Sequence, residues 1–183
     1  MRKRNVNQTP AEVIFRRRSY LNLVLGYRDL LIRLVVIALA MLIVLSQVFM
    51  LTQAKGQDMF PSIKDGDLLF GYRLQGEYSK NDVVIYKDHN GNRCVGRIIA
   101  RGSDVVTMGE TGSLLVNGTS QAGEIIYPTY AKEGVEYPYV VPDGCVFILG
   151  DYRTQAVDNR DFGAVDLGDV EAKVITFARR RSI

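Results

Sequence analysis

The sequence predicts a mainly β domain preceded by one N-terminal membrane-spanning helix. Three observations predict this fold class. Between Leu34 and Leu51 there are 18 residues without a charged side chain, and with the apolar residues before them they reach the roughly 20 that a spanning helix needs. From Thr52 onward, short apolar runs alternate with turn residues, and no helical period persists. The 17 Gly, five Pro and ten Tyr residues also favour a turn-rich β fold.

The charge distribution predicts the orientation of the helix. Residues 1–33 carry eight basic and two acidic side chains, and the remaining residues carry 15 basic and 18 acidic ones. An excess of Lys and Arg marks the cytoplasmic side of a span. We therefore expect a cytoplasmic N-terminus at 1–29, a transmembrane helix at 30–51 and an extracytoplasmic β domain at 52–183, in a single-pass protein of the cell membrane. Nucleic-acid binding is the competing explanation of the basic head, and the apolar segment that follows argues against it.

Seven strands are predicted after the helix, separated by turn signals. Asn117-Gly118 after an apolar run is a hairpin signal, and residues 119–142 are expected to be a long excursion of low hydrophobicity. The predicted strands are Asp67–Tyr72, Asp82–Lys87, Cys94–Ala100, Val105–Met108, Leu114–Val116, Cys145–Leu149 and Val170–Phe177.

The composition argues against several kinds of site. One His and two Cys residues are too few for an ordinary zinc site, so we expect no metal and no cofactor. A Ser-His-Asp triad would have to use His89, which lies in a turn-like stretch. Cys94 and Cys145 could form a disulfide outside the cell. Their apolar surroundings favour two buried free thiols instead.

Gly56–Ile63, followed by Gly66-Asp67, resembles a motif of the type I signal peptidases, in particular of the single-span Gram-positive branch. It is similar to the family's G-x-S-M-x-P-[TS]-[LI] followed by G-D, with Asp58 in place of the serine nucleophile. Asn81–Tyr86 and Val95–Ala100 are similar to the family's D-[IV]-V-V-[FY] and K-R-[VI]-I strands, and Gly96 stands at the general-base lysine.

A third segment, Gly150–Gly163, follows in the family's order and resembles G-D-N-R-x-x-S-x-D-S-R-x-x-G. Ala156 stands where the family has the serine that hydrogen-bonds the lysine, and Tyr152, Asn159 and the Arg101–Asp104 loop also depart from the pattern. The resemblance covers most of residues 30–178. It implies a signal-peptidase-like fold of two antiparallel β-sheets with an extended cap.

The three substitutions bear on catalysis. In the family, a serine attacks the scissile carbonyl after a neutral lysine removes its proton. Asp58 cannot form an alkoxide, Gly96 has no group that accepts a proton, and Ala156 has no hydroxyl. In a related serine protease, loss of the nucleophile or base costs about a million-fold in turnover. We therefore predict that the protein is not an enzyme but a degenerate serine/lysine signal peptidase.

There are two alternatives to this prediction, in which other residues would carry out the catalysis. Asp58 could share a proton with Asp151 or Asp158, as in an aspartic-protease dyad, or Ser62 could act as a displaced nucleophile. The structural interpretation is that the two other aspartates hold loops together. In that interpretation they pair with arginines, namely Arg97, Arg153 or Arg160.

The resemblance also implies a peptide-binding groove between Thr52–Gln57 and Arg93–Val95. Asp58 would place a negative charge there and favour a basic segment, unless it merely pairs with Arg97 or a backbone amide in a vestigial groove. Relatives insert an apolar rim into the bilayer, here expected near Met59, Phe60 and Ile63. The candidates for peptide binding are Gly56, Gln57, Asp58, Met59, Arg93, Cys94 and Val95; the structural residues of the motifs are Pro61, Gly66, Asp67, Arg97, Gly150, Asp151, Arg153, Asp158 and Arg160.

Signal-peptidase-like proteins that lack the catalytic residues are associated, in Gram-positive bacteria, with sortase-assembled pili. There they act as assembly factors or chaperones for pilin subunits. The resemblance therefore implies an accessory protein at the cell surface that binds a pilin subunit, a sortase or both. We expect no nucleic acid and no small-molecule substrate. The alternatives are a scaffold or regulator of an active signal peptidase, and a signal peptidase with an unconventional catalytic arrangement.

Overall fold

The computed structural model describes residues 10–121 and 126–179, and it divides into two compact units between Ser46 and Gln47. Residues 1–9 of the predicted cytoplasmic N-terminus therefore lie outside the described part. The described residues of the first unit all lie in one helix, α1 (Pro10–Val48). An 18-residue window within its segment Asn22–Val48 has a mean hydropathy of 2.6, and none of that window is buried. By length and composition, this helix can span a membrane.

The predicted span ends too late. Residues 49–51 do not belong to the helix but begin the first strand, β1 (Phe49–Gln53). Met50 is 8% exposed and packs in the core of the second unit. A continuous apolar run looks the same whether it faces lipid or a protein core, so the sequence could not mark this boundary.

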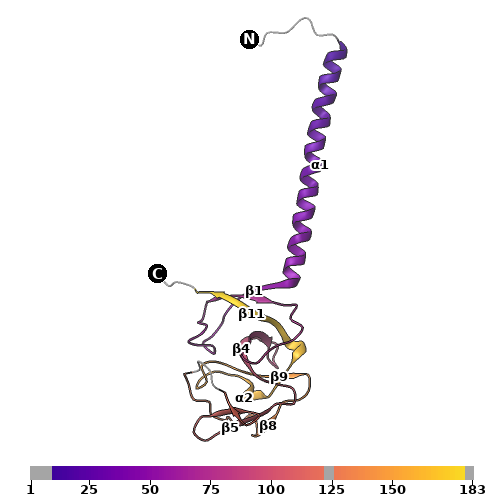
Figure 1. The fold of residues 1–183 in the computed structure, drawn as a ribbon. Coiled ribbons are helices and arrows are strands. Elements are labelled where there is room, and N and C mark those ends of the chain that lie inside the picture. Colours follow the sequence, from indigo (N-terminus) through magenta and orange to yellow (C-terminus); the bar gives the residue numbers. More distant parts are fainter. Residues whose placement is uncertain (1–9, 122–125, 180–183) are drawn as a thin grey trace. The chain divides into compact units, whose positions relative to one another are not determined.

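The larger sheet of the second unit has seven antiparallel strands in the order β1-β2-β11-β3-β4-β9-β10. Strand β11, drawn in yellow in Figure 1, lies between β2 and β3 in the interior of the sheet. Besides β1, the strands are β2 (Leu68–Tyr72), β3 (Val83–Lys87), β4 (Arg93–Arg101), β9 (Cys145–Leu149), β10 (Val165–Asp166) and β11 (Val170–Ala178).

The smaller sheet has four antiparallel strands in the order β7-β6-β5-β8. Asn117 and Gly118, with φ of 53° and 76°, form the predicted hairpin turn. The two antiparallel sheets confirm the predicted fold class, and all seven predicted strands are present to within one residue at each end. The strands of this sheet are β5 (Val105–Met108), β6 (Leu114–Val116), β7 (Thr119–Ser120) and β8 (Tyr139–Val140).

The connections include one short helix, α2 (Asn159–Phe162), and a 3-10 turn at Leu167–Asp169. Asp158 caps α2, and the side chain of Asp161 bonds back to the backbone N–H of Asp158, which forms a capping box. Residues 126–138, here called the cap segment, contain no helix or strand.

Three apolar clusters form the core. One lies on the larger sheet around Tyr86, Ile98 and Ile148, and a second joins the two sheets, since it contains both Phe147 and Val106. Side chains alternate along β9, so that Val146 and Ile148 belong to the first cluster and Phe147 and Leu149 to the second. Cys94 and Cys145, both half-buried, are free thiols.

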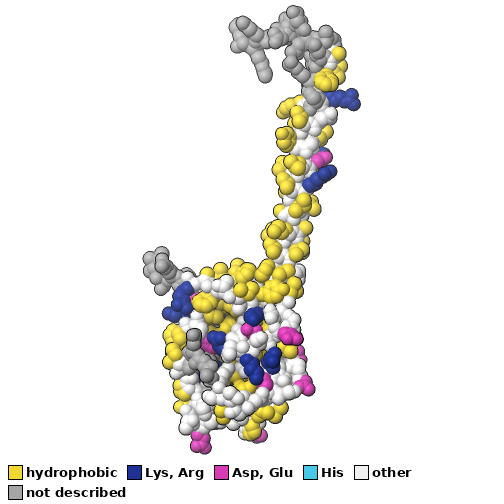
Figure 2. Space-filling view, in the orientation of Figure 1, with side chains coloured by type: hydrophobic (Ala, Val, Ile, Leu, Met, Phe, Trp, Pro, Cys, Tyr) yellow, Lys and Arg dark blue, Asp and Glu magenta, His cyan; other side chains and the backbone are white. Residues whose placement is uncertain are grey.

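The apolar rim expected near Met59, Phe60 and Ile63 is wrong for Met59 and Ile63, because both side chains are only 3% exposed and belong to the third cluster, while Phe60 is partly buried. Exposed apolar side chains gather instead on β1, β2 and β11. Figure 2 shows hydrophobic side chains at the end of this unit where β1 and β11 lie. Leu51 is 65% and Ile175 is 56% exposed there.

Candidate functional site

The loop that carries Asp58 is fastened to the loop of the third motif. The backbone N–H of Tyr152 donates to the carbonyl of Asp58 at 2.8 Å. A Cβ on Gly150 would lie 2.6 Å from that carbonyl oxygen and 2.4 Å from the Cβ of Ala156, so only glycine allows this approach. The fold thus brings together two of the three positions that depart from the family's catalytic residues.

The carboxyl of Asp58 is half-buried, and its Oδ1 accepts a hydrogen bond from the backbone N–H of Val157 at 3.3 Å. Burial raises the pKa of Asp58. The Val157 amide lowers that pKa, the charge of Asp158 raises it, and the charge of Lys132 lowers it. Within residues 10–121 and 126–179, no cation lies in ion-pair distance of this carboxyl. The sequence left two partners for Asp58, Arg97 or a backbone amide, and the structure shows a backbone amide, that of Val157.

Asp151 is buried and bound by Arg97. Its two oxygens accept from Nε and Nη2 of Arg97 at 2.8 and 2.6 Å, and the hydroxyl of Ser62 donates to it at 2.6 Å. The hydroxyl of Ser62 therefore donates to a carboxylate that is already paired with a guanidinium.

Asp158 is also buried and receives two hydrogen bonds of 2.8 Å from the guanidinium of Arg160. Arg153 does not join either carboxylate. Its Nε donates to the carbonyl of Gly150 and its Nη1 to the hydroxyl of Thr129, and burial lowers its pKa to about 10. These contacts support loop-holding roles over an aspartic dyad.

At Gly96 the space beside the strand is filled. A Cβ there would lie 2.4 Å from Cγ2 of Ile148 and 3.3 Å from Cε1 of Tyr86. The side chains of Tyr86 and Ile148, which belong to one core cluster, fill this space, so a longer side chain would require them to move.

Strand β4 is paired on one side only along 93–96. β3 pairs with it from Arg93 to Arg97, whereas its pairing with β9 begins at Arg97. In the part of the chain that the structure describes, residues 93–96 therefore have no strand on their second side, and we call this stretch the open edge.

The open edge lies beside the loop that carries Asp58. Val95 packs against the core cluster that contains Ala54 and Met59. Burial raises the pKa of Cys94 to about 11, and the charges of Asp88 and Asp58 add to that rise. Two segments far apart in sequence thus meet at one place.

The other predicted binding residues have different surroundings. Arg93 pairs with Glu171 on β11, and Met59 is buried in the core. Gly56 has a φ of 82° and donates to Asp65 at 2.9 Å. Gln57 is exposed, and its carbonyl accepts from the N–H of Phe60.

The remaining structural residues of the first motif shape its loop. The Phe60–Pro61 peptide is cis. The N–H of Gly66 donates to the carbonyl of Ala54 at 2.9 Å, and the buried carboxylate of Asp67 accepts from the N–H of Lys64 at 3.0 Å.

One residue at this site was missed from the sequence. Lys132, in the cap segment, donates through Nζ to the carbonyl of Ala156 and to Oδ2 of Asp161, both at 2.6 Å. A single lysine in a segment of low hydrophobicity gives no motif, and its partners are 24 and 29 residues away.

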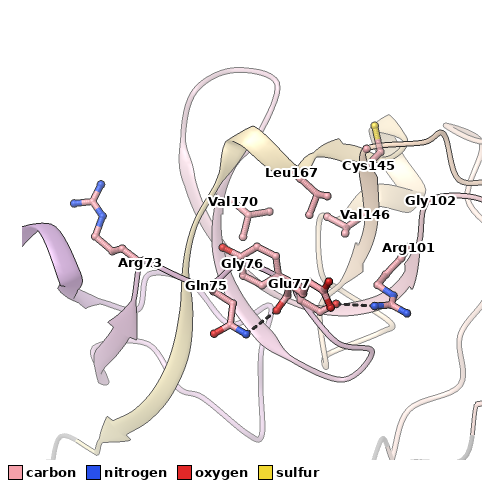
Figure 3. Close-up of a pocket in the computed structure, with 12 residues that line it drawn as sticks. Arg73, Gln75, Gly76, Glu77, Arg101, Gly102, Cys145, Val146, Leu167 and Val170 are labelled. Carbon is pink, nitrogen blue, oxygen red and sulfur yellow. Dashed lines mark hydrogen bonds between the residues drawn. The ribbon is translucent and has the colours of Figure 1, made fainter.

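A separate cavity of about 360 Å³ is drawn in Figure 3. There the Nη1 of Arg101 donates to the carbonyl of Tyr78 at 3.2 Å, and Arg73 points away from the other labelled side chains. Of the predicted peptide-binding residues, none lines this cavity.

Comparison with known proteins places the chain in a family. The family model described as "Signal peptidase, peptidase S26" matches residues 27–178. Signal peptidase I of Bacillus caldolyticus is 27% identical over 135 residues, covering 66% of this chain and 74% of that protein. Signal peptidase I of Bacillus licheniformis is 32% identical over 126 residues, covering 61% and 67%. A crystal structure of a signal peptidase I from Enterococcus faecalis V583 aligns with a TM-score of 0.47 at 25% identity, covering 55% of this chain and 97% of that one.

These comparisons overturn the prediction that the protein is not an enzyme. The relatives are named signal peptidase I, which is an active enzyme family, and no feature of the described residues shows that turnover is absent. The identities of the side chains at positions 58, 96 and 156 do not by themselves show whether the protein is an active peptidase. The chain belongs to the signal peptidase family, peptidase S26.

Proposed function

We propose that this protein is anchored in the cell membrane with its N-terminus in the cytoplasm, and that outside it binds an extended segment of an exported protein. We further propose that this protein, here called the client, is a pilin subunit or the sortase of a sortase-assembled pilus. The apolar helix α1 supports the anchor, and the eight basic side chains among residues 1–33 support the orientation.

The open edge of β4 carries this proposal. A strand with one unpaired side presents N–H and C=O groups to which an extended peptide can add as a further strand. The adjacent Asp58 has no cation in ion-pair distance among the described residues. When ionised it would favour a client segment with a basic side chain. The pilus assignment rests on the resemblance in sequence.

A second candidate function is peptide-bond cleavage with an unconventional catalytic arrangement. The position of Asp58 favours it, because this half-buried carboxyl lies in the loop beside the open edge, where a peptide would bind, and burial raises its pKa. A cleaved peptide would bind at the same open edge of β4. The two functions differ in that the second one breaks a peptide bond of the bound segment.

Both functions are tested with the full chain in detergent micelles, mixed with purified pilin, purified sortase and a precursor that carries a signal peptide. We expect pilin or sortase to bind. If neither pilin nor sortase binds, the pilus assignment is refuted. Cleavage of the precursor would establish the second function.

A matched pair of variants tests the open edge. Arg93 and Lys87 both pair with Glu171, but only Arg93 lies on the open edge, while Lys87 is on β3 inside the sheet. Arg93→Ala should weaken client binding about tenfold, within the range of interface truncations, and Lys87→Ala should leave it unchanged. Equal effects of the two changes would place the client elsewhere.

A further inference from the structure

The peptide bond between Ala156 and Val157 lies between two charged groups. Its carbonyl accepts from Nζ of Lys132 at 2.6 Å, and its N–H donates to Oδ1 of Asp58 at 3.3 Å. A charge-assisted hydrogen bond to a peptide carbonyl polarises the whole peptide group and strengthens the donor on its other side. Ammonium, peptide and carboxyl thus form one chain of hydrogen bonds.

The ammonium of Lys132 is fixed in place. It also donates to Oδ2 of Asp161 at 2.6 Å, and this same oxygen accepts from the N–H of Asp158 at 2.9 Å in the capping box of α2. The cap segment passes close to α2. At Gly134 there is no room for a side chain, since a Cβ there would meet the carbonyl oxygen of Asp161. The backbone around Lys132 therefore has little freedom relative to the loop that it contacts.

We propose that Lys132 is a positioning residue of the Asp58 site: it holds the Ala156–Val157 peptide so that its N–H faces Asp58, and thereby sets the charge of that carboxyl. The inference rests on the proposed function in that Asp58 adjoins the client site. The chain of hydrogen bonds itself can be tested without a client.

The other titratable groups that act on Asp58 cannot replace Lys132. Asp158, before α2, carries a negative charge and is paired with Arg160. Tyr86 on β3 and Cys94 on β4 both have a pKa raised mainly by burial, and they are neutral near pH 7. Among the described residues, Lys132 is the cation whose charge lowers the pKa of Asp58. Its removal should raise that pKa, so that Asp58 stays protonated to a higher pH.

The test is a titration of Asp58 in the full chain in micelles, followed by NMR with ¹³C-labelled aspartate and assigned by the signal lost in Asp58→Asn. We expect Lys132→Met to raise the midpoint by about half a pH unit or more, and Lys132→Arg to restore most of the original value. Lys80→Met is the matched control. It removes an ion pair with Asp104 of 3.0 Å, and should not move the midpoint. An unchanged midpoint in Lys132→Met overturns the inference.

A second measurement uses the unaltered protein, in case Lys132→Met does not fold. The amide resonance of Val157 should titrate together with Asp58, and a resonance that stays constant through that titration overturns the inference. Client binding by the same samples separates the two proposals. A shifted midpoint without client binding refutes the proposed function alone, and binding with an unchanged midpoint refutes only the role of Lys132.

Discussion

At the scale of single residues, the site is built by close backbone approaches. Gly150 lets the carbonyl of Asp58 and the Cβ of Ala156 both approach its own backbone, and Gly96 leaves room for Ile148. The sequence motifs identify positions 58, 96 and 156, because each motif has its own spacing. They do not identify Lys132, since its contacts to Ala156 and Asp161 depend on how the cap segment folds over α2.

The packing at Gly96 leads to a stability prediction. Gly96→Ala should lower the free energy of unfolding by about 1–3 kcal/mol, the usual range for overpacking, because the new Cβ would meet Cγ2 of Ile148. In an Ile148→Ala background that methyl group is gone, and the added cost should fall. Urea unfolding of the four proteins of this double-mutant cycle measures the coupling.

Gly76→Ala is the control for this cycle, because a Cβ at Gly76 would meet no atom within 4 Å. It should change the free energy of unfolding much less than Gly96→Ala does. An equal cost of Gly96→Ala in both backgrounds would show that Ile148 does not determine the packing at this position.

At the scale of secondary-structure elements, the sequence predicts seven strands well, since each is an apolar run between turn residues. It misses β1, which is merged with the apolar run of α1, and the two-residue strands β7, β8 and β10. Such short pairings are decided by tertiary contacts and not by local pattern. The cap segment has no periodicity from which its path could be predicted.

The position of β1 predicts how the second unit should be truncated. A fragment that begins at Gln47 keeps β1 whole, whereas one that begins at Thr52 loses Phe49, Met50 and Leu51. Because Met50 is buried, we expect the shorter fragment to be less stable by about 2 kcal/mol or more. Thermal unfolding in mild detergent compares the two.

Met50→Ala in the longer fragment separates burial from strand pairing, because it removes the buried side chain and leaves β1 in place. It should reproduce a large part of the loss. Equal midpoints for the fragments that begin at Gln47 and Thr52 would mean that β1 contributes nothing to the stability of this unit.

At the scale of the whole molecule, family membership follows from a match over residues 27–178, and the motifs already point to it. The prediction of a protein without activity was wrong, because it inferred the chemistry of the site from three missing side chains. The environment of Asp58, a half-buried carboxyl with a raised pKa in a hydrogen-bond chain with Lys132, depends on tertiary contacts. No motif in the sequence displays them.

Hydrogen exchange tests whether a client segment adds to the open edge of β4. The full chain in micelles is compared with and without purified pilin or sortase, whichever protein binds. We predict slower amide exchange at 93–96 and at 55–58, and unchanged exchange in the second sheet at 105–108 and 114–116. Binding that leaves 93–96 unprotected, or protection confined to the second sheet, would contradict the proposed site.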